Sequence, residues 1–352
     1  MNVRPQSLVT VIVPSNRPLA LCKGPIESAI RFSAAKNYRL VISDNSGEGA
    51  KLAYFSDLPE HVTYMTPLAP TAIENVLACL DEAETEFVLP IGDDDYVEAL
   101  PGEPDFDFAS LGEDFIGVRP LTQVFAVGEG VLRTHSFTID GQTAADRMYE
   151  YRQKVAGDNT LYYSYLRRDD FQELIHLLIG HPIVTGDMDW AVVYSLVCNG
   201  KVAFDGSTCF RYDVGRWRWT EGIEASIRSI YEKAGLPPEA VAFEHLFRFL
   251  DCYVLAFRRT LRLSELDRIK SLYAAVVIFL GRTLHKSENQ PQQYVGFERE
   301  LGMIRAVLKE PDDYLINVFD VAARVADRLK PGLYEQYVHW FAAVQDRSGK
   351  AE

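Results

Sequence analysis

The first part of the chain alternates apolar runs typical of strands with amphipathic patterns typical of helices, and no other feature limits its fold as strongly. Helical spacing of apolar side chains marks 24–37 and 71–83, and Gly24-Pro25 predicts the start of the first helix. The order strand, helix, strand, strand, helix, strand indicates a mostly parallel sheet with helices on its faces. The four predicted strands, each an apolar run with β-branched residues, are 7–14, 38–47, 61–67 and 86–92.

Polar loops follow three of these strands, with the sequences SNR at 15–17, DNS at 44–46 and DDD at 93–95. The carboxyl ends of neighbouring strands in an open α/β sheet meet at one edge, where ligands bind. In the third loop, adjacent carboxylates ~5 Å apart repel by about 3 kcal/mol at an effective dielectric of ~20. Either the side chains point into water in a solvated turn, or a cation lies between them. We therefore expect a polar site at this edge, and a metal site is the sharper of the two interpretations.

The rest of the chain divides near residue 220. Residues 105–220 read as irregular α/β, with a strand at 115–127, a strand passing into a helix over 160–178, and a helix at about 189–198 followed by one or two strands. Beyond 221, successive helical patterns are separated by prolines. We predict an α/β catalytic domain over 1–220 and an all-helical domain over 221–352.

Charge and cysteine usage exclude several classes of protein. The net charge of −14 argues against a nucleic-acid partner, which needs a basic face. The five cysteines are scattered without a CxxC pair, so neither a disulfide framework nor a zinc site is indicated. The start of the chain lacks a signal-peptide pattern, and Leu272–Leu280 is far shorter than the ~20 residues of a membrane helix. We expect a cytoplasmic protein, which leaves open a peripheral contact at the inner face of a membrane; the oligomeric state is not predicted.

Several of these stretches together carry a resemblance to a known family. With VTVIVPSNRP, LVISDNSG, Asn75, EFVLPIGDDDYV and TGDMDWAVVYSLVCNGKVAFD in this order, residues 8–218 resemble the family 2 glycosyltransferases with the GT-A fold. The resemblance implies a metal-dependent, inverting transfer of a sugar from a nucleotide diphosphate donor, linked to UDP, dTDP or GDP. The acceptor would be a hydroxyl of a carbohydrate or lipid-linked saccharide, and synthesis of a bacterial surface glycan is the context that the resemblance suggests.

The resemblance also assigns roles to individual residues. The cation, Mn²⁺ or Mg²⁺, would be held by Asp94 and Asp95, and the departure from D-x-D leaves open which is the main ligand. In an inverting transfer a carboxylate takes the proton of the acceptor hydroxyl. TGDMDW offers Asp187, directly after a glycine, ahead of Asp189, and the register stays open because a methionine interrupts the expected acidic pair. The nucleotide donor would contact Pro14, Ser15, Arg17, Asp44, Asn75 and Asp93.

Two other functions compete with this interpretation. A nucleotidyltransferase shares the metal and the α/β layout, but it would need a glycine-rich loop with a lysine after the first strand, and PSNRPLALCKG is a poor version of one. The second rival is a nucleotide-sugar-binding scaffold that has lost its catalytic activity. The intact aspartate run and the acids at 187 and 189 argue against it.

Overall fold

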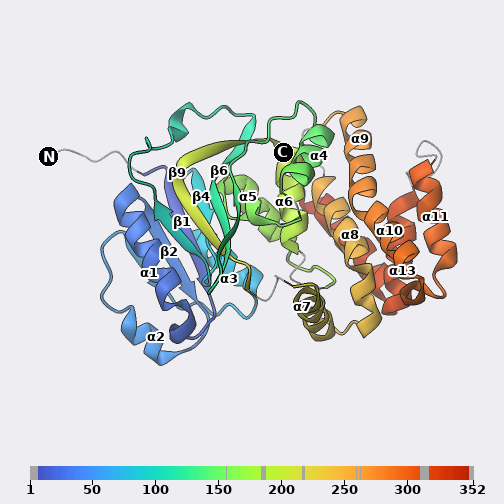
Figure 1. Ribbon diagram of the computed structural model, residues 1–352, viewed down its shortest axis with the longest axis horizontal. Coiled ribbons are helices and arrows are strands. Elements are labelled where there is room, and N and C mark those ends of the chain that lie inside the picture. The colour runs from blue at the N-terminus through green and yellow to red at the C-terminus, as the bar shows by residue number, and fades with distance from the viewer. Residues whose placement is uncertain are drawn as a thin grey trace. The chain divides into compact units, whose positions relative to one another are not determined.

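The computed structural model of the chain describes residues 7–155, 157–183, 188–215, 219–258, 260–261, 263–309 and 317–348. The chain forms two compact units (Figure 1). The first, called here the sheet unit, comprises residues up to 140 together with 160–176 and 201–215. The second, the helical unit, comprises 141–159, 177–200 and the residues from 216 onward.

The sheet unit is built on one nine-stranded sheet, in the order β3-β2-β1-β4-β8-β6-β9-β5 with β7 paired to β6. The central strands β1 and β2 are buried along almost their whole length, as expected for strands covered on both faces. The strands are β1 (Val9–Ser15), β2 (Arg39–Asp44), β3 (Val62–Met65), β4 (Phe87–Pro90), β5 (Tyr96–Ala99), β6 (Phe115–Ala126), β7 (Gly130–His135), β8 (Tyr165–Arg167) and β9 (Lys201–Asp213).

The predicted α/β class with an all-helical C-terminal part is confirmed, and the sheet is mixed rather than parallel throughout. Strands β3, β2, β1 and β4 run parallel, as their sequence pattern predicts. Strand β8 is antiparallel to both β4 and β6, and β5 is antiparallel to β9. At the β6–β8 crossing a Cβ on Gly117 would lie 2.2 Å from the carbonyl oxygen of Tyr165, so this close pairing requires glycine.

Helices α1 (Leu19–Lys36) and α3 (Ala72–Glu82) cover opposite faces of the parallel strands (Figure 1). The prediction that the first helix begins at Gly24 is wrong, because Pro18 precedes its first turn and Pro25 lies inside the helix. The missing N–H of Pro25 removes one bond to the carbonyl of Leu21, whose side chain is exposed, so water can satisfy that carbonyl. Two further helices are the short α2 (Gly49–Tyr54) and α5 (Arg168–Leu177).

The core of the sheet unit lies between the parallel strands and α1. Alternate residues of β1 pack with the apolar face of α1, and all are at most 2% exposed. This burial fixes the strands in register and holds their carboxyl ends together at one edge. The central members of this cluster are Val9, Val11, Val13, Ile26, Ala29, Phe32, Leu40, Ile42, Phe87 and Leu89.

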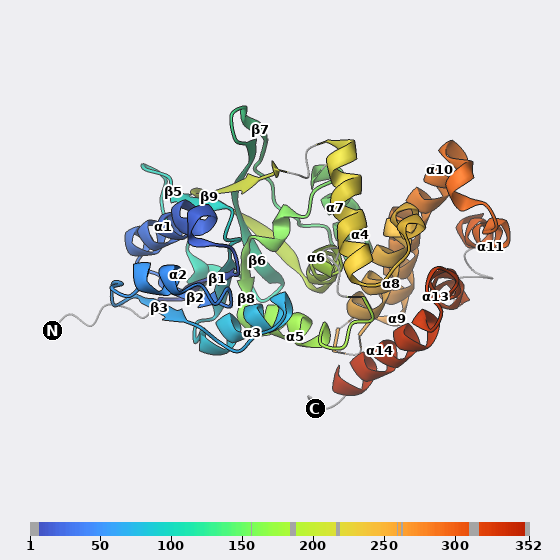
Figure 2. The same ribbon diagram turned by 90° about the horizontal axis from the view of Figure 1, so that it is seen from below.

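The helical unit is arranged around α8 (Glu244–Ala256), which packs against α6, α13 and α14 (Figure 2). Most of its side chains are buried, including Leu246, Phe249 and Leu250. In the part of the chain that the structure describes, every helix is too short or too polar to span a lipid bilayer. The other helices of this unit are α4 (Ala144–Val155), α6 (Met188–Asn199), α7 (Thr220–Lys233), α9 (Glu265–Ala275), α10 (Gly281–Asn289), α11 (Glu298–Lys309), α13 (Val318–Leu329) and α14 (Leu333–Ser348).

Candidate functional site at the strand ends

The ends of β1, β2 and β4 bring the three predicted polar loops together. Ser15 at the end of β1 is the register partner of Asp44 at the end of β2. Strand β4 pairs with β1 on its other side, and Asp93 follows it. The hydroxyl of Ser15 donates a 2.7 Å hydrogen bond to Oδ2 of Asp93. Sequence therefore located this cluster correctly, because parallel strands place their carboxyl ends at the same edge.

Asp93 holds the loop that follows β1. Its Oδ2 accepts hydrogen bonds from the backbone N–H groups of Asn16 and Arg17, at 3.1 and 3.0 Å, as well as from Ser15. Its Oδ1 accepts from Nε of Arg17 at 3.0 Å. With four donors within the protein and 7% exposure, Asp93 orders the loop, and its expected contact with the nucleotide donor stays a prediction.

Arg17 connects two of the three consecutive aspartates. Its guanidinium binds Asp93 through Nε and Asp94 through Nη2. The side chains of Arg17 and Asp94 are 39% and 40% exposed, so this ion pair lies at the accessible rim of the site. Nη1 of Arg17 has no hydrogen-bond acceptor among the described residues, and so this donor is available to an anionic ligand.

Asp44 lies in a buried network with a lysine that the sequence interpretation missed. Nζ of Lys51, on α2, donates to Oδ1 of Asp44 at 2.9 Å and to the hydroxyl of Ser15 at 2.6 Å. The hydroxyl of Tyr64 donates to Oδ2 of Asp44 at 2.5 Å, and the N–H of Ser46 donates to Oδ1. Burial favours the neutral carboxyl, but the hydrogen bonds from Tyr64, Lys51 and Ser46 outweigh it and lower the pKa of Asp44.

Asn75 links α3 to the same strand ends. Its carbonyl accepts a 2.6 Å hydrogen bond from Ser43, and its amide donates to the backbone oxygen of Ser15 at 3.3 Å. The helix is set in place by a capping box at its first turn, in which Thr71 and Glu74 exchange hydrogen bonds. Asn75 is 2% exposed, so the structure shows it ordering the strand ends, and its contact with the donor stays a prediction.

Asp95 is the most deeply buried of the three aspartates. It is 1% exposed, and its Oδ1 accepts a 2.9 Å hydrogen bond from the N–H of Asp213 at the end of β9. Its Oδ2 is buried without a hydrogen-bond partner among the described residues. A Cβ on Gly92 would lie 2.7 Å from this oxygen and 2.8 Å from Oδ1 of Asp94. The two oxygens therefore face the same small space, which glycine keeps open.

The electrostatics of this space favour a positive ligand. Burial raises the pKa of Asp94, with Arg17 opposing it and Asp93 adding to it. Burial, the carboxylate of Asp94 and that of Asp213 raise the pKa of Asp95 well above its usual range, against the hydrogen bond from the N–H of Asp213. The carboxylates thus lie close together, and the positive charge of Arg17 is too small to offset their burial and mutual repulsion.

The donor set fits a divalent cation that is shared with a ligand. Within the described residues, no group of three or more His, Cys, Asp or Glu side chains is arranged to hold a metal ion by itself. Mg²⁺ characteristically uses one or two carboxylates together with substrate phosphates rather than an all-protein cage. The unpartnered Oδ2 of Asp95 and the nearby Oδ1 of Asp94 match that smaller requirement.

Three predicted residues remain, namely Pro14, Asp187 and Asp189. Pro14 is half-buried on β1 opposite Ser43. Asp187 lies outside the described residues. Asp189 belongs to the helical unit, in the first turn of α6, where its carboxylate accepts hydrogen bonds from the side chain of Asn159 and from the N–H of Trp190. Its helix spans Met188–Asn199, as predicted to within a residue.

Sequence reasoning missed three residues of the site. Lys51 and Tyr64 carry no motif, and only the pairing of β2 with β3 and the packing of α2 bring them to Asp44. Asp213 approaches Asp95 because β5 and β9 pair antiparallel. The available signal is that Asp213 ends KVAFDGSTCFRYD, the stretch after the predicted helix in which one or two strands are expected.

Comparison with known proteins identifies solved structures of distant sequence. No family model and no curated protein matches the chain. Staphylococcus aureus TarS is 16% identical with a TM-score of 0.42, over 89% of this chain and 55% of that chain. TarS 1–349 in complex with UDP-GlcNAc is 13% identical with a TM-score of 0.39, over 92% of each chain. The mannosyltransferase PcManGT from Pyrobaculum calidifontis, in complex with GDP-Man and Mn²⁺, is 12% identical with a TM-score of 0.41, over 99% of this chain and 88% of that chain. At these levels of similarity, the function has to be argued from the residues.

Proposed function

We propose that the protein is a glycosyltransferase that uses a nucleotide-sugar donor and a divalent cation. One observation carries the proposal: half-exposed Asp94 and buried Asp95 present oxygens to one small space at the carboxyl edge of a parallel sheet. That edge is where ligands bind in open α/β sheets. A nucleotide diphosphate supplies the anionic oxygens that a cation held by only two carboxylates still needs.

The loops around the aspartates are suited to the donor nucleotide. Arg17 lies at the rim with one N–H group uncommitted, so it can bind a diphosphate oxygen. Ser15, Asn75 and Asp93 hold the strand ends rigid, which places the donor without further ordering cost. At the end of β2, Asp44 would accept a hydrogen bond from an N–H of the nucleobase.

Asp94 and Asp95 would hold Mn²⁺ or Mg²⁺ and leave the diphosphate to complete its coordination. When bound there, the cation would neutralise the negative charge that develops on the diphosphate as it leaves the sugar. The cation would also relieve the repulsion among the carboxylates, since burial and Asp93 raise the pKa of Asp94, and burial and Asp94 raise the pKa of Asp95. Asp213 adds to the negative potential through its proximity to Asp95.

The acceptor hydroxyl needs a base, and we assign this role to Asp187, with Asp189 as the alternative. The hydroxyl would attack the anomeric carbon on the face opposite the diphosphate, so the product would have inverted configuration. Asp189 has an ordered environment, since Asn159 and the N–H of Trp190 bind its carboxylate. We further propose that the acceptor is a saccharide. The protein would act in the cytoplasm, in the synthesis of a surface glycan.

The structure disfavours a nucleotidyltransferase. Such an enzyme would use a lysine near the loop after β1 to bind phosphate. Nζ of Lys51 does reach this loop, with hydrogen bonds to Ser15 and to the carbonyl oxygen of Arg17. However, Lys51 is 0% exposed and its charge is paired with Asp44, so its ammonium is not available to a phosphate.

The proposal is tested by thermal denaturation with UDP, GDP, dTDP and CDP, each with and without Mn²⁺. A ligand that binds only the folded protein raises its stability with occupancy, by about 2.7 kcal/mol at 100 times the dissociation constant. We expect one nucleotide to raise the melting temperature in Mn²⁺ and much less in EDTA. If none of the four does so, the proposal is wrong. Slow hydrolysis of the matching sugar nucleotide separates an enzyme from a scaffold that only binds.

A further inference from the structure

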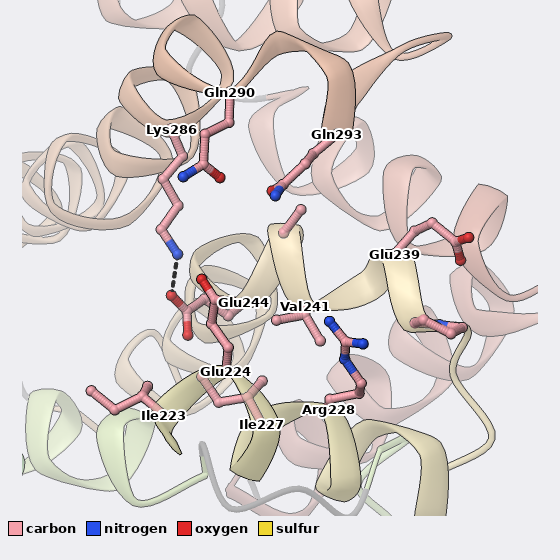
Figure 3. A pocket seen from close by; sticks show the side chains of 12 residues that line it. Ile223, Glu224, Ile227, Arg228, Glu239, Val241, Glu244, Lys286, Gln290 and Gln293 are labelled. Carbon is pink, nitrogen blue, oxygen red and sulfur yellow. Dashed lines mark hydrogen bonds and ion pairs between the residues drawn. The ribbon is translucent and has the colours of Figure 1, made fainter. Parts of the chain in front are cut away.

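The helical unit contains a cavity of about 440 Å³ that the proposed function does not use. It is lined by α7, α8 and α10, with the short helical turns Pro238–Phe243 and Pro291–Tyr294 (Figure 3). All of its lining residues belong to the helical unit. Pockets for small ligands typically measure about 300–1,000 Å³. The cavity therefore has room for a ligand of one or two sugar rings.

One wall of the cavity is aliphatic. Ile223 and Ile227 lie one turn apart on α7, and Val241 lies opposite them on the turn before α8 (Figure 3). Ile227 is 3% exposed and anchors α7, while Ile223 and Val241 are half-buried and border the space. This surface can cover the C–H face of a small ring, but it contains no aromatic side chain for stacking.

Polar side chains surround the rest of the cavity, and five of them are uncommitted. The labelled side chains border one space in Figure 3. Among the described residues, five of them make neither a hydrogen bond nor an ion pair. All five are exposed and line the hollow, so each can reach a ligand that enters it. The five are Glu224, Arg228, Glu239, Gln290 and Gln293.

The charges around the cavity select the kind of ligand. Lys286 is paired with Glu244, which is 7% exposed and is also 3.5 Å from Arg248, so this acid is compensated. The uncommitted charges are then the guanidinium of Arg228 and the carboxylates of Glu224 and Glu239. A phosphate or carboxylate would meet two carboxylates, and an ammonium would meet the guanidinium. Neither an anionic nor a cationic ligand is therefore complementary to both the guanidinium and the carboxylates.

A ligand with many hydroxyl groups is complementary to this set. Arginine only donates hydrogen bonds, glutamate only accepts them, and glutamine does both. Each hydroxyl group both donates and accepts, so neighbouring hydroxyls can satisfy carboxylates on one side and the guanidinium on the other. We propose that the cavity is a binding site for a neutral saccharide, with its hydroxyls on Arg228, Glu239 and Gln293 and its C–H face on the aliphatic wall. The site is independent of the transfer reaction proposed above.

The test uses the full-length chain without nucleotide or Mn²⁺, so that its outcome does not depend on the transferase proposal. The probes are glucose, N-acetylglucosamine, cellobiose and maltose, with glucose 6-phosphate and glucosamine as charged analogues. Saturation-transfer NMR detects binding, and calorimetric titration gives the affinity. We expect at least one neutral probe to bind more tightly than either charged analogue.

Variants assign the binding to this cavity. Gln293→Trp should fill the space and abolish binding, while Arg228→Met and Glu239→Gln should each weaken it about tenfold or more, the usual loss for a hydrogen bond to a charged group. These residues are exposed, so the variants should fold, and unchanged melting temperatures check this. Arg305→Met on α11, whose partner is the exposed Glu288, is the matched control and should bind as the wild type does.

Three results would overturn the inference. They are the absence of binding by every neutral probe, tighter binding of glucose 6-phosphate or glucosamine than of the neutral sugars, and unchanged affinity in both Gln293→Trp and Arg228→Met.

Discussion

Nζ of Lys51 lies 2.9 Å from Oδ1 of Asp44, and the two side chains are 0% and 2% exposed. The same ammonium donates to Ser15 and to the carbonyl oxygen of Arg17. One buried cation therefore ties α2 to the ends of β1 and β2. A buried pair of this kind contributes little net stability compared with apolar residues, but removing one partner leaves the other charge uncompensated.

We predict that Lys51→Met destabilises the protein by about 3–5 kcal/mol, because the carboxylate of Asp44 would remain buried without its cation. Urea denaturation followed by tryptophan fluorescence and circular dichroism measures the loss. Lys23→Met is the control, since Lys23 is 49% exposed and 4.0 Å from Glu27. That change should cost no more than about 1 kcal/mol. Equal losses in the two variants would contradict the role given to Lys51.

Asp44 should also make part of the stability depend on acid pH. Its pKa is lowered in the fold, so its contribution is complete above its unfolded pKa of about 3.9 and is lost as the pH falls through the lower folded value. The difference in unfolding free energy between wild type and Asp44→Asn should therefore shrink as the pH falls from 6 to 3. A difference that stays constant over this range would show that the ionised carboxylate is not the stabilising form.

The part of the site that lies at the ends of the parallel strands could be predicted from the sequence. Ser15, Asp44 and Asp93 each follow an apolar run, and parallel pairing alone brings them together. Lys51 could not be predicted, because a lysine in a short helix is normally exposed and only tertiary packing buries it. The orphaned oxygen of Asp95 likewise depends on the approach of β9.

The second half of the sheet was less predictable for a related reason. The strand at 115–127 and the helix near 189–198 were recognised from their composition. Their sequence pattern contains no information on partners, and β6 pairs with β7, β8 and β9 across large separations along the chain. Segments 141–159 and 177–200 group with the C-terminal helices, although they precede residue 220. The predicted boundary at 220 stays a prediction.

Gly92→Ala should weaken Mn²⁺-dependent nucleotide binding by at least tenfold while leaving the fold intact. The added Cβ would lie 2.7 Å from Oδ2 of Asp95 and 2.8 Å from Oδ1 of Asp94, so at least one of these oxygens must move. Gly206→Ala is the control, since its nearest neighbour would be a ring carbon of Phe204 at 3.7 Å. Calorimetric titration with nucleotide and Mn²⁺ makes the comparison. If Gly92→Ala binds like Gly206→Ala, the space between the two aspartates is not a ligand site.

The assignment of the base predicts a separation between turnover and donor binding. Asp187→Asn should lower the transfer rate by roughly 10²–10⁴, the usual contribution of a positioned base, with donor affinity nearly unchanged. Asp189→Asn is the internal comparison, because its carboxylate already binds Asn159 and the N–H of Trp190. Rates at saturating donor and acceptor are measured beside donor binding. Full turnover in both variants would show that neither aspartate is the base. Loss of turnover in Asp189→Asn alone would assign the base to Asp189.

The most direct test of the account is a calorimetric titration of the wild type and of Asp94→Asn/Asp95→Asn with the stabilising nucleotide, in Mn²⁺ and in EDTA. Amide oxygens are weaker ligands than carboxylates for a hard cation, and the exchange also removes two negative charges. We predict that Mn²⁺ strengthens nucleotide binding by the wild type at least tenfold and leaves the double variant unaffected. If the double variant binds nucleotide and Mn²⁺ as the wild type does, the metal site at Asp94 and Asp95 is refuted.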